Sequence, residues 1–253
     1  MGLSTRIHQL QDAIRKIRRQ RADPEAVAPA VHVLDAISLF LGRGDATMLG
    51  RMRASALGRR LLDERHDALA LIADRDRLRA MPEGSLGRLY CAFAEGHALF
   101  PEALAEQVRL ARAASGGLVP DASPEVAYLH DRYRDLHDLW HVVTGYGTDM
   151  AGELAIVNFQ STQVGYRAMT ISSWVQLLSI ALRTGRFDVL LTGFRARRRG
   201  RQSAYLLAAD WDRLLTMPLE EVRRELGVPP LRPYRPWDHP QPANREARAE
   251  ARA

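Results

Sequence analysis

The sequence predicts an all-α protein, folded as a single helical domain with a metal site between two consecutive helices. Apolar residues recur at three- and four-residue steps along most of the chain, and no segment alternates apolar and polar residues as a strand would. The site is predicted by a third observation: two histidines four residues apart, a glycine-rich corner and then a glutamate. A chain of 253 residues is long enough to bury a substantial core in one domain.

The chain divides into three segments. Residues 1–22 are expected to form a basic amphipathic helix, because their apolar residues fall at helical spacing. Residues 23–228 form the predicted helical domain, which carries the two histidines and the glutamate. Residues 229–253 carry six of the 13 prolines and are expected to form an extended or disordered tail.

Helix starts and stops are indicated by proline, capping residues and glycine. Pro24 after Asp23 opens one helix, and Pro124 opens the helix that carries the histidines. The helices expected within the domain cover residues 24–41, 46–62, 67–79, 86–96, 102–114, 124–144, 149–182 with room for a bend, 204–215 and 219–226. Between the last long helix and residue 204 stands a dense arginine cluster, made of Arg195, Arg197, Arg198, Arg199 and Arg201. It has two interpretations: a solvated turn, or an anchor for anionic lipid headgroups or an acidic partner.

Composition narrows the functional class. The formal charge of +6 is carried by arginine, with Lys16 as the only lysine, and no nucleic-acid-binding motif is present, so no nucleic-acid partner is expected. The single cysteine, Cys91, excludes a disulfide within the chain and a cysteine-rich zinc site. No apolar run reaches the roughly 18 residues of a membrane span, and the N-terminus lacks the apolar core of a secretory signal.

The motif His137-Asp138-Leu139-Trp140-His141 is followed, after Gly145-Tyr146-Gly147, by Glu153. Residues four apart share a helix face, so both imidazoles can reach one ion, and Asp138 lies about 100° from His137 in the same arc. If the next helix folds back at the corner, Glu153 returns to the level of the histidines. Two imidazoles and two carboxylates suit zinc, or alternatively iron, manganese or cobalt, better than calcium or magnesium.

The motif and its flanks resemble the coenzyme Q biosynthesis protein 4 family. His137-Asp138-x-x-His141, eleven residues and Glu153 are similar to the family's H-D-x-x-H-x(11)-E signature. The flanking segments 61–65, 82–93, 128–136 and 218–227 are also similar, so the resemblance covers roughly residues 45–230. One departure is Gln160-Ser161, which stands where many members carry Phe-Glu.

The resemblance implies ubiquinone biosynthesis by a bacterial-type member, through metal-dependent C1 decarboxylation of a 4-hydroxy-3-methoxy-5-polyprenylbenzoate. The oxidative variant would add a hydroxyl at C1. His137, Asp138, His141 and Glu153 would hold the metal, and Asp138 and Tyr146 are the candidates for the general acid. Asp138 has a second interpretation, as a carboxylate that only orients a histidine. For Tyr146 the alternative is a packed aromatic at the turn.

The prenyl tail would need an apolar channel, for which the helix after Glu153 supplies residues that could equally be core: Ile156, Val157, Phe159, Met169, Ile171, Trp174, Leu177, Leu178 and Ile180. Within this helix Asn158, Gln160 and Gln163 would bond the substrate ring or satisfy buried groups. Expected partners are the prenylated substrate, other ubiquinone-synthesis enzymes and a second copy of the chain. The expected location is the bacterial cytoplasm, in peripheral contact with the inner membrane.

Other functions compete with this one. A non-catalytic lipid-binding scaffold for the ubiquinone enzymes would need only a structural metal. A zinc peptidase is disfavoured because Asp138 is one methylene shorter than the glutamate of H-E-x-x-H. A phosphohydrolase of the His-Asp type would leave His141 unexplained.

Overall fold

The computed structural model describes residues 44–97, 99, 101–114 and 123–238. Within these residues the regular elements are helices, and the only extended pairing is an isolated bridge between Ser85 and Pro218. The all-α class is therefore confirmed. The expected helices at 1–22 and 24–41 and the end of the C-terminal tail lie outside the described residues.

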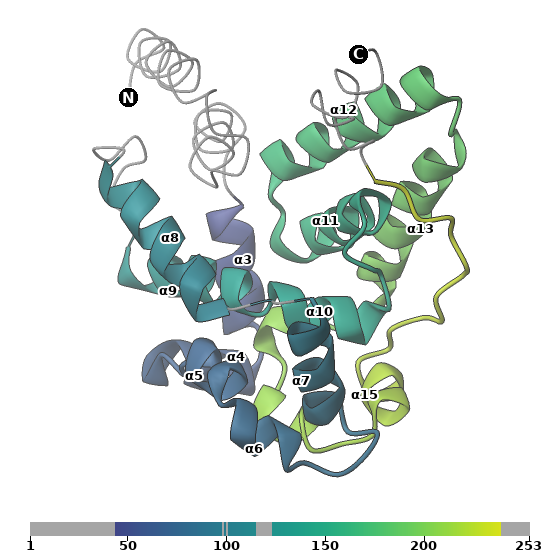
Figure 1. The fold of residues 1–253 in the computed structure, drawn as a ribbon. Coiled ribbons are helices and arrows are strands. Elements are labelled where there is room, and N and C mark those ends of the chain that lie inside the picture. The colour runs from purple at the N-terminus through teal and green to yellow at the C-terminus, as the bar shows by residue number, and fades with distance from the viewer. Residues whose placement is uncertain (1–43, 98, 100, 115–122, 239–253) are drawn as a thin grey trace, which may run out of the picture.

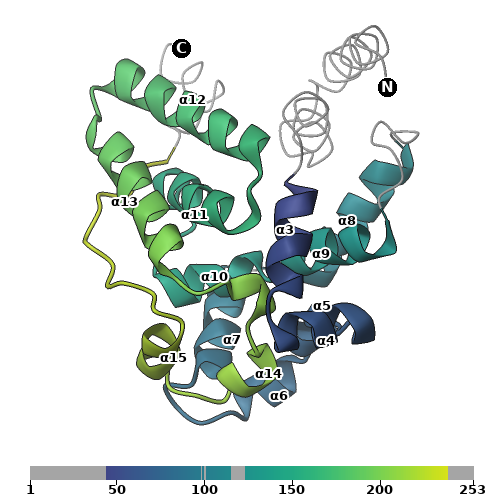
Figure 2. The ribbon, with the colours of Figure 1, turned by 180° about the vertical axis from the view of Figure 1, so that it is seen from behind.

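Helix α10 (His137–Thr144) lies at the centre of the molecule, between two groups of helices (Figure 1). The view from behind shows the same order (Figure 2). On one side three helices pack on one another: α11 (Met150–Val164), α12 (Arg167–Thr184) and α13 (Asp188–Gln202). On the other lie α4 (Ala56–Glu64), α5 (Ala68–Ala73), α6 (Arg75–Arg79), α7 (Leu86–Gly96), η1 (Leu206–Ala208), α14 (Trp211–Leu214) and α15 (Leu219–Glu225). A flanking group is formed by α3 (Asp45–Arg53), α8 (Pro101–Ala114) and α9 (Pro124–Asp135).

Several expected helices are split into two by residues that can cap. Ser55 ends the run from α3 and caps α4, its Oγ accepting the Gly58 N–H at 2.9 Å. Asp74 does the same between α5 and α6 by accepting the Arg77 N–H at 3.0 Å. Gly165, with φ of 71°, separates α11 from α12. A break creates two new helix ends with free N–H or C=O groups, and the residue at each break satisfies some of these groups.

The core has two parts. The larger cluster is centred on fully buried aromatic side chains such as Tyr90, Trp140, Phe159 and Trp211. A smaller cluster joins the start of α11 to α12 and α13 through Leu154, Leu177 and other residues. Because α10 and α11 contribute to the larger cluster, the corner between them is held by packing on both sides.

The structure corrects the interpretation of the arginine cluster as a turn. Residues 188–202 form α13, which was not expected from the sequence. Its buried face repeats every three or four residues through Val189, Thr192, Ala196 and Arg199. A periodicity built partly on threonine and arginine is not recognised as an apolar stripe, which is why the helix was missed.

The first part of the Pro-rich tail is ordered. Residues 229–238 run extended from α15 past α13 towards the start of α11 (Figures 1 and 2). Prolines favour such an extended path, and the segment is hydrogen-bonded to Arg199 of α13 and to Gly147 and Asp149 in the corner before α11. Of the two expected states, extended and disordered, these ten positions adopt the first.

Candidate metal centre

The corner between α10 and α11 is built on a left-handed glycine. Gly145 has φ of 79°, and its N–H donates to the His141 carbonyl at 2.7 Å, which ends α10. Asp149 then starts α11 by accepting the N–H groups of Ala151 and Gly152 at 3.1 and 3.2 Å. The chain reverses within these few residues, so the first turn of α11 lies beside the histidine helix.

Two arginines hold the end of α10. Arg223 of α15 donates to the carbonyls of Val142 and Val143 at 3.0 and 2.9 Å, and Arg199 of α13 donates to that of Thr144 at 2.9 Å. These carbonyls belong to the last turn and have no partner inside the helix. Positive charge at a helix C-terminus is also favourable. The two guanidinium groups therefore fix the position of the helix that carries the histidines.

The extended tail holds the other side of the corner. Tyr234 accepts the Gly147 N–H at 2.8 Å and donates to Asp149 at 2.8 Å. Trp237 makes two backbone hydrogen bonds here, donating to the Asp149 carboxylate at 2.9 Å and accepting the Ala151 N–H at 3.1 Å. Residues that the sequence assigned to a loose end therefore stabilise the turn that brings α11 back.

The structure brings Glu153 to the two histidines and places Asp138 beside them, in two overlapping groups of side chains. The Nε2 atoms of His137 and His141 are 3.2 Å apart. Glu153 reaches both, with Oε2 3.5 Å from His137 Nε2 and Oε1 3.4 Å from His141 Nε2. The ligand atoms of Asp138 and the two histidines all lie within 4.8 Å of one another. The role of these residues as metal ligands stays a prediction, but their convergence is a fact of the fold.

Hydrogen bonds orient both imidazoles with Nε2 facing the cluster. His141 Nδ1 lies 2.9 Å from the Tyr146 carbonyl, which can only accept, so Nδ1 carries the proton and Nε2 keeps its lone pair. His137 Nδ1 faces the Gln160 amide, 3.0 Å from its Nε2 and 3.3 Å from its Oε1, and Oε1 also accepts the Tyr133 hydroxyl at 2.8 Å. The amide therefore holds the His137 ring in place, while the contact of His141 Nδ1 with a carbonyl is the outer partner typical of histidines that bind metals.

The donor set fits a zinc-like ion. Two ligands about 2.0–2.1 Å from a tetrahedral centre are separated by roughly 3.3–3.4 Å. The three separations between the histidine nitrogens and Glu153 are 3.2, 3.4 and 3.5 Å. Neutral nitrogen and carboxylate ligands of this type suit a borderline first-row cation.

The electrostatics of the cluster follow from the same contacts. Burial favours the neutral form of Glu153, but hydrogen bonds and charge from His137 and His141 outweigh it and lower the pKa of Glu153 to about 2. Burial would lower the pKa of His137, but the carboxylates of Glu153 and Asp138, helped by Gln160, raise it overall. Without a metal, the site is therefore a carboxylate paired with a histidine that readily takes up a proton.

Helix α7 forms one wall of the centre. The ring of Phe93 stacks on His141, with centroids 5.9 Å apart and planes 21° from parallel. One turn earlier Tyr90 is fully buried, and its hydroxyl has no hydrogen-bond partner in the described residues. Burial raises the pKa of Tyr90, and the negative charge of Asp138 acts in the same direction. Sequence comparison placed Tyr90 in a family-like segment, but no sequence pattern shows that its hydroxyl lacks a partner.

The remaining predicted residues are placed as follows. The Tyr146 side chain lies over the Arg199 guanidinium, 5.0 Å from the ring centroid, and the backbone carbonyl of Tyr146 is what contacts His141. Asn158, Gln160 and Gln163 are fully buried, and only Gln160 contacts the cluster. Of the apolar residues proposed as core or channel, Ile156, Phe159, Met169, Leu177 and Ile180 are buried, whereas Ile171 and Leu178 are half exposed.

Comparison with known proteins gives a consistent picture. The profile of the family described as "Coenzyme Q (ubiquinone) biosynthesis protein Coq4" matches residues 45–232. The chain is 28% identical over 184 residues to the mitochondrial ubiquinone biosynthesis protein COQ4 homolog of Bos taurus, covering 72% of this chain and 65% of the relative. It is 33% identical over 180 residues to mitochondrial COQ4 of Yarrowia lipolytica, covering 70% and 64%. The chain thus spans slightly less than two thirds of either relative.

A solved structure shares the fold. The crystal structure of a candidate ubiquinone biosynthesis protein from Nostoc punctiforme PCC 73102 superposes with a TM-score of 0.60 and 21% identity, covering 87% of this chain and 97% of that one. At this level of identity the similarity concerns the architecture alone.

Proposed function

This chain belongs to the Coq4 family of coenzyme Q (ubiquinone) biosynthesis proteins, and we propose that it acts in that pathway by removing the ring carboxylate of a 4-hydroxy-3-methoxy-5-polyprenylbenzoate. The observation that carries the proposal is the convergence of His137, His141 and Glu153 at separations of 3.2–3.5 Å, with both imidazoles oriented from behind. Asp138 and the two histidines form a second, overlapping group whose ligand atoms lie within 4.8 Å of one another, and Glu153 is not part of that group. These four residues would hold a divalent metal, zinc first, with iron, manganese or cobalt as alternatives.

The exposure of the centre favours catalysis over a purely structural metal. His141 is almost completely buried, but the side chains of His137 and Glu153 are 26% and 36% exposed. A structural metal is closed off by protein ligands, whereas a catalytic one keeps a position for substrate. The alternative of a non-catalytic lipid-binding scaffold predicts a closed centre, and the partial exposure supports the enzyme instead.

The reaction needs electron withdrawal at the carboxylate and a proton at C1. A bound divalent cation supplies Lewis acidity and a fixed positive charge for the substrate carboxylate. In the non-oxidative route, protonation of C1 breaks the aromatic system, and cleavage of the bond to the carboxylate releases carbon dioxide and restores it. The para-hydroxyl makes C1 electron-rich. In the oxidative route the carboxylate leaves C1 as carbon dioxide and water supplies the hydroxyl that replaces it. Dioxygen accepts the two electrons and two protons released and leaves as hydrogen peroxide.

The chain offers two groups for the proton. Asp138 lies within reach of both histidines, and Tyr90 places an unpartnered phenol in the wall beside them. Because the pKa of Tyr90 is raised, its hydroxyl is protonated at neutral pH and is a donor. The Tyr146 phenol lies with Arg199 instead. Phe93, stacked on His141, excludes water from that side of the ring.

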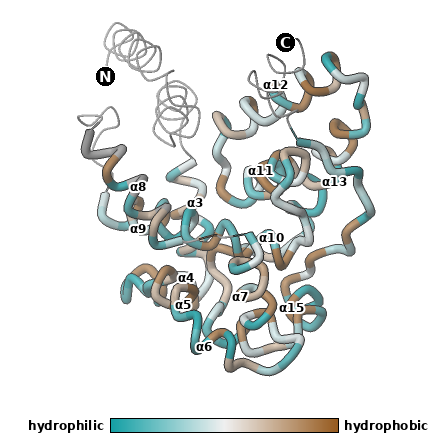
Figure 3. The backbone as a smooth tube through the Cα atoms, viewed as in Figure 1, coloured by the Kyte–Doolittle hydropathy of each residue, from teal (hydrophilic) through white to brown (hydrophobic). Residues whose placement is uncertain are grey.

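A prenylated substrate requires access to lipid. None of the helices in the described part of the chain is long and apolar enough to cross a bilayer. However, α12 and α13 carry a row of large apolar residues that are 48–69% exposed: Ile171, Val175, Leu178, Leu182, Phe187, Leu191 and Phe194. In Figure 3 hydrophobic segments alternate with hydrophilic ones on α12 and at the start of α13, and the rest of α13 is mostly hydrophilic. An exposed patch of this kind next to arginines is typical of peripheral contact with an anionic membrane, which here would be the bacterial inner membrane.

The metal-dependent activity is tested with Glu153→Gln and Asp138→Asn. Glu153→Gln keeps the shape but removes the charge, so we expect lower metal content by elemental analysis and loss of decarboxylation. Asp138→Asn should lose activity whether or not the metal remains. Glu221→Gln on the surface of α15 is the matched control and should behave as the natural chain. Each protein is assayed on the prenylated hydroxybenzoate with and without dioxygen, which distinguishes the two products.

Three outcomes would contradict the proposal. Folded Glu153→Gln and Asp138→Asn variants that keep both metal and activity would exclude these carboxylates from the chemistry. A metal-loaded natural chain that converts no substrate under either atmosphere would support the scaffold. Elemental analysis that finds no divalent metal in active protein would exclude the metal.

A further inference from the structure

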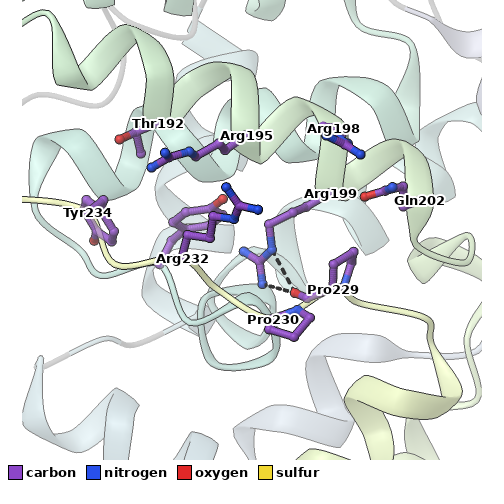
Figure 4. Close-up of a pocket in the computed structure, with 10 residues that line it drawn as sticks. Thr192, Arg195, Arg198, Arg199, Gln202, Pro229, Pro230, Arg232 and Tyr234 are labelled. Atoms are coloured by element: carbon purple, nitrogen blue, oxygen red, sulfur yellow. Dashed lines mark hydrogen bonds between the residues drawn. The ribbon is translucent and has the colours of Figure 1, made fainter.

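A second site lies behind the corner, between α13 and the extended tail. It is a pocket of about 360 Å³, within the range of small-ligand sites. Figure 4 shows that Thr192, Arg195, Arg198, Arg199 and Gln202 enter it from α13, and that Arg232 and Tyr234 face them from the tail. The ring of Tyr146 completes the lining.

The pocket is strongly positive without a matching acid. Four of the ten lining residues are arginines, and none is aspartate or glutamate. No salt bridge neutralises these four arginines within the part of the chain that the structure describes. The nearby acids are already used, since Asp149 accepts from Tyr234 and Asp188 pairs with Arg186. Several guanidinium groups brought together without a counter-ion repel one another, so the fold sustains an unfavourable charge here.

Arg199 shows that the charge is built into the fold. Its side chain is only 6% exposed, and its Nε and Nη2 atoms donate to the carbonyls of Pro229 and Thr144 at 2.8–2.9 Å. These acceptors are neutral, and Nη1 is buried, with no hydrogen-bond partner among the described residues and no surface open to the pocket. The Tyr146 ring, 5.0 Å from the guanidinium carbon, is uncharged as well. The positive charge of Arg199 therefore has no anionic partner in the described part of the chain and adds to the positive potential of the pocket.

We propose that this pocket binds a phosphate monoester or diphosphate group. Guanidinium forks pair with phosphate oxygens in a bidentate manner, and three or four of them match an anion that carries two charges better than a single carboxylate. Gln202 adds a neutral amide donor, whereas the Thr192 hydroxyl is already donated to the Asp188 carbonyl. The Tyr146 phenol also donates, because burial keeps it protonated despite the opposing charge of Arg199 and Arg195.

The phosphate has two possible sources, a soluble ester or a lipid headgroup. On α13, Arg198 lies on the same stripe as the exposed Leu191 and Phe194, since residues 191, 194 and 198 are spaced by three and four. The pocket therefore borders the apolar row described above. A lipid phosphate could enter while its chains stay on that row, whereas a soluble ester would use the pocket alone.

Titration of the full-length chain with inorganic phosphate, followed by calorimetry, tests the site itself. Arg195→Gln and Arg232→Gln should each weaken binding by about 10-fold or more, the usual effect of losing a charged hydrogen bond. Arg224→Gln removes the same charge from an exposed position of α15 outside the pocket and should leave binding unchanged. Arg199 is not substituted, because it also supports the fold.

Vesicle sedimentation distinguishes the two sources. Phosphatidylcholine vesicles carry either phosphatidic acid, a monoester, or phosphatidylglycerol at equal charge density. Preference for phosphatidic acid that is lost in Arg195→Gln supports the site and assigns it to lipid. Saturable binding of inorganic phosphate without that preference supports the site and assigns it to a soluble ester.

The proposal is overturned if phosphate does not bind saturably and the vesicles show no preference. It is also overturned if Arg224→Gln weakens binding as much as the pocket variants, because the effect would then reflect net charge. Metal content is measured in parallel. Since these arginines lie outside the donor set, the metal should remain bound, and failure of the decarboxylase proposal would leave this one intact.

Discussion

The amide of Gln160 offers the sharpest test of the metal centre. It lies behind His137, with Nε2 3.0 Å and Oε1 3.3 Å from Nδ1, and Oε1 also accepts the Tyr133 hydroxyl at 2.8 Å. In Gln160→Met the side chain keeps its length and apolar body but loses both polar contacts. Loss of an outer partner of a metal-binding histidine typically weakens binding by about 10–100-fold, or about 1.4–2.7 kcal/mol. We therefore expect the zinc dissociation constant to rise by that factor in competition with a chelating dye.

The same substitution should lower the stability of the metal-free protein. Burial raises the pKa of Tyr133, so its hydroxyl stays protonated, loses its oxygen acceptor and keeps only the Met169 sulfur at 3.5 Å. Thioether sulfur is a weak acceptor, so we expect a cost of up to about 1–3 kcal/mol, which urea unfolding can measure. Tyr133→Phe/Gln160→Met removes that hydroxyl and should recover most of the stability but none of the zinc affinity. Tyr133→Phe alone should bind zinc as the natural chain does. Unchanged zinc affinity in folded Gln160→Met would refute the assignment of His137 as an oriented ligand.

Three further predictions follow from other contacts. Tyr90→Phe removes an unpartnered hydroxyl, so the melting temperature should stay the same or rise. If the phenol donates the proton, the rate of decarboxylation should fall by about 10²–10⁴-fold, and an unchanged rate would exclude Tyr90 as the proton donor. Zinc should raise the melting temperature more at pH 8 than at pH 6, because the metal needs neutral His137, whose pKa is raised, and equal shifts at both pH values would contradict this prediction. In the metal-free protein, the stability that His137 contributes is complete below about pH 6.5 and is lost as pH rises through its folded pKa. The stability that Glu153 contributes is lost only as pH falls towards its pKa of about 2. Gly152→Ala places a Cβ 2.1 Å from a backbone carbonyl of the corner and should lower the free energy of unfolding in urea by about 1–3 kcal/mol. The control Gly50→Ala, whose Cβ would have nothing within 4 Å, should stabilise α3 by about 0.5–1 kcal/mol. Similar effects of the two substitutions would show that the corner accommodates a methyl group without strain.

Much of the site was predictable because it is local. The spacing of His137 and His141 fixes their common helix face, and a glycine corner followed by Asp149 predicts a tight reversal that returns Glu153. The all-α class follows equally from the period of the apolar residues. These features depend on contacts between residues close in sequence, which a pattern can express.

What the sequence did not show depends on contacts between distant segments. Helix α13 was missed because its buried face includes Thr192 and Arg199, and a buried arginine is recognisable only once its acceptors, the carbonyls of Thr144 and Pro229, are placed. The order of residues 229–238 could not be predicted either. Tyr234 and Trp237 are held by Asp149, 85 and 88 residues earlier in the chain. The unpartnered hydroxyl of Tyr90 is likewise a property of the packed core alone.

The two sites share their supporting residues, and this connects them physically. The carbonyl of Tyr146 fixes the tautomer of His141, while its ring lines the arginine pocket. Arg199 lines the same pocket, holds the tail at Pro229 and satisfies the last carbonyl of the histidine helix. An anion that draws Arg199 towards the pocket would weaken its hold on Thr144. An anion held by Arg195, Arg198 and Arg232 would leave that contact intact and neutralise the charge around Arg199, so we expect it to strengthen the corner that positions the metal ligands.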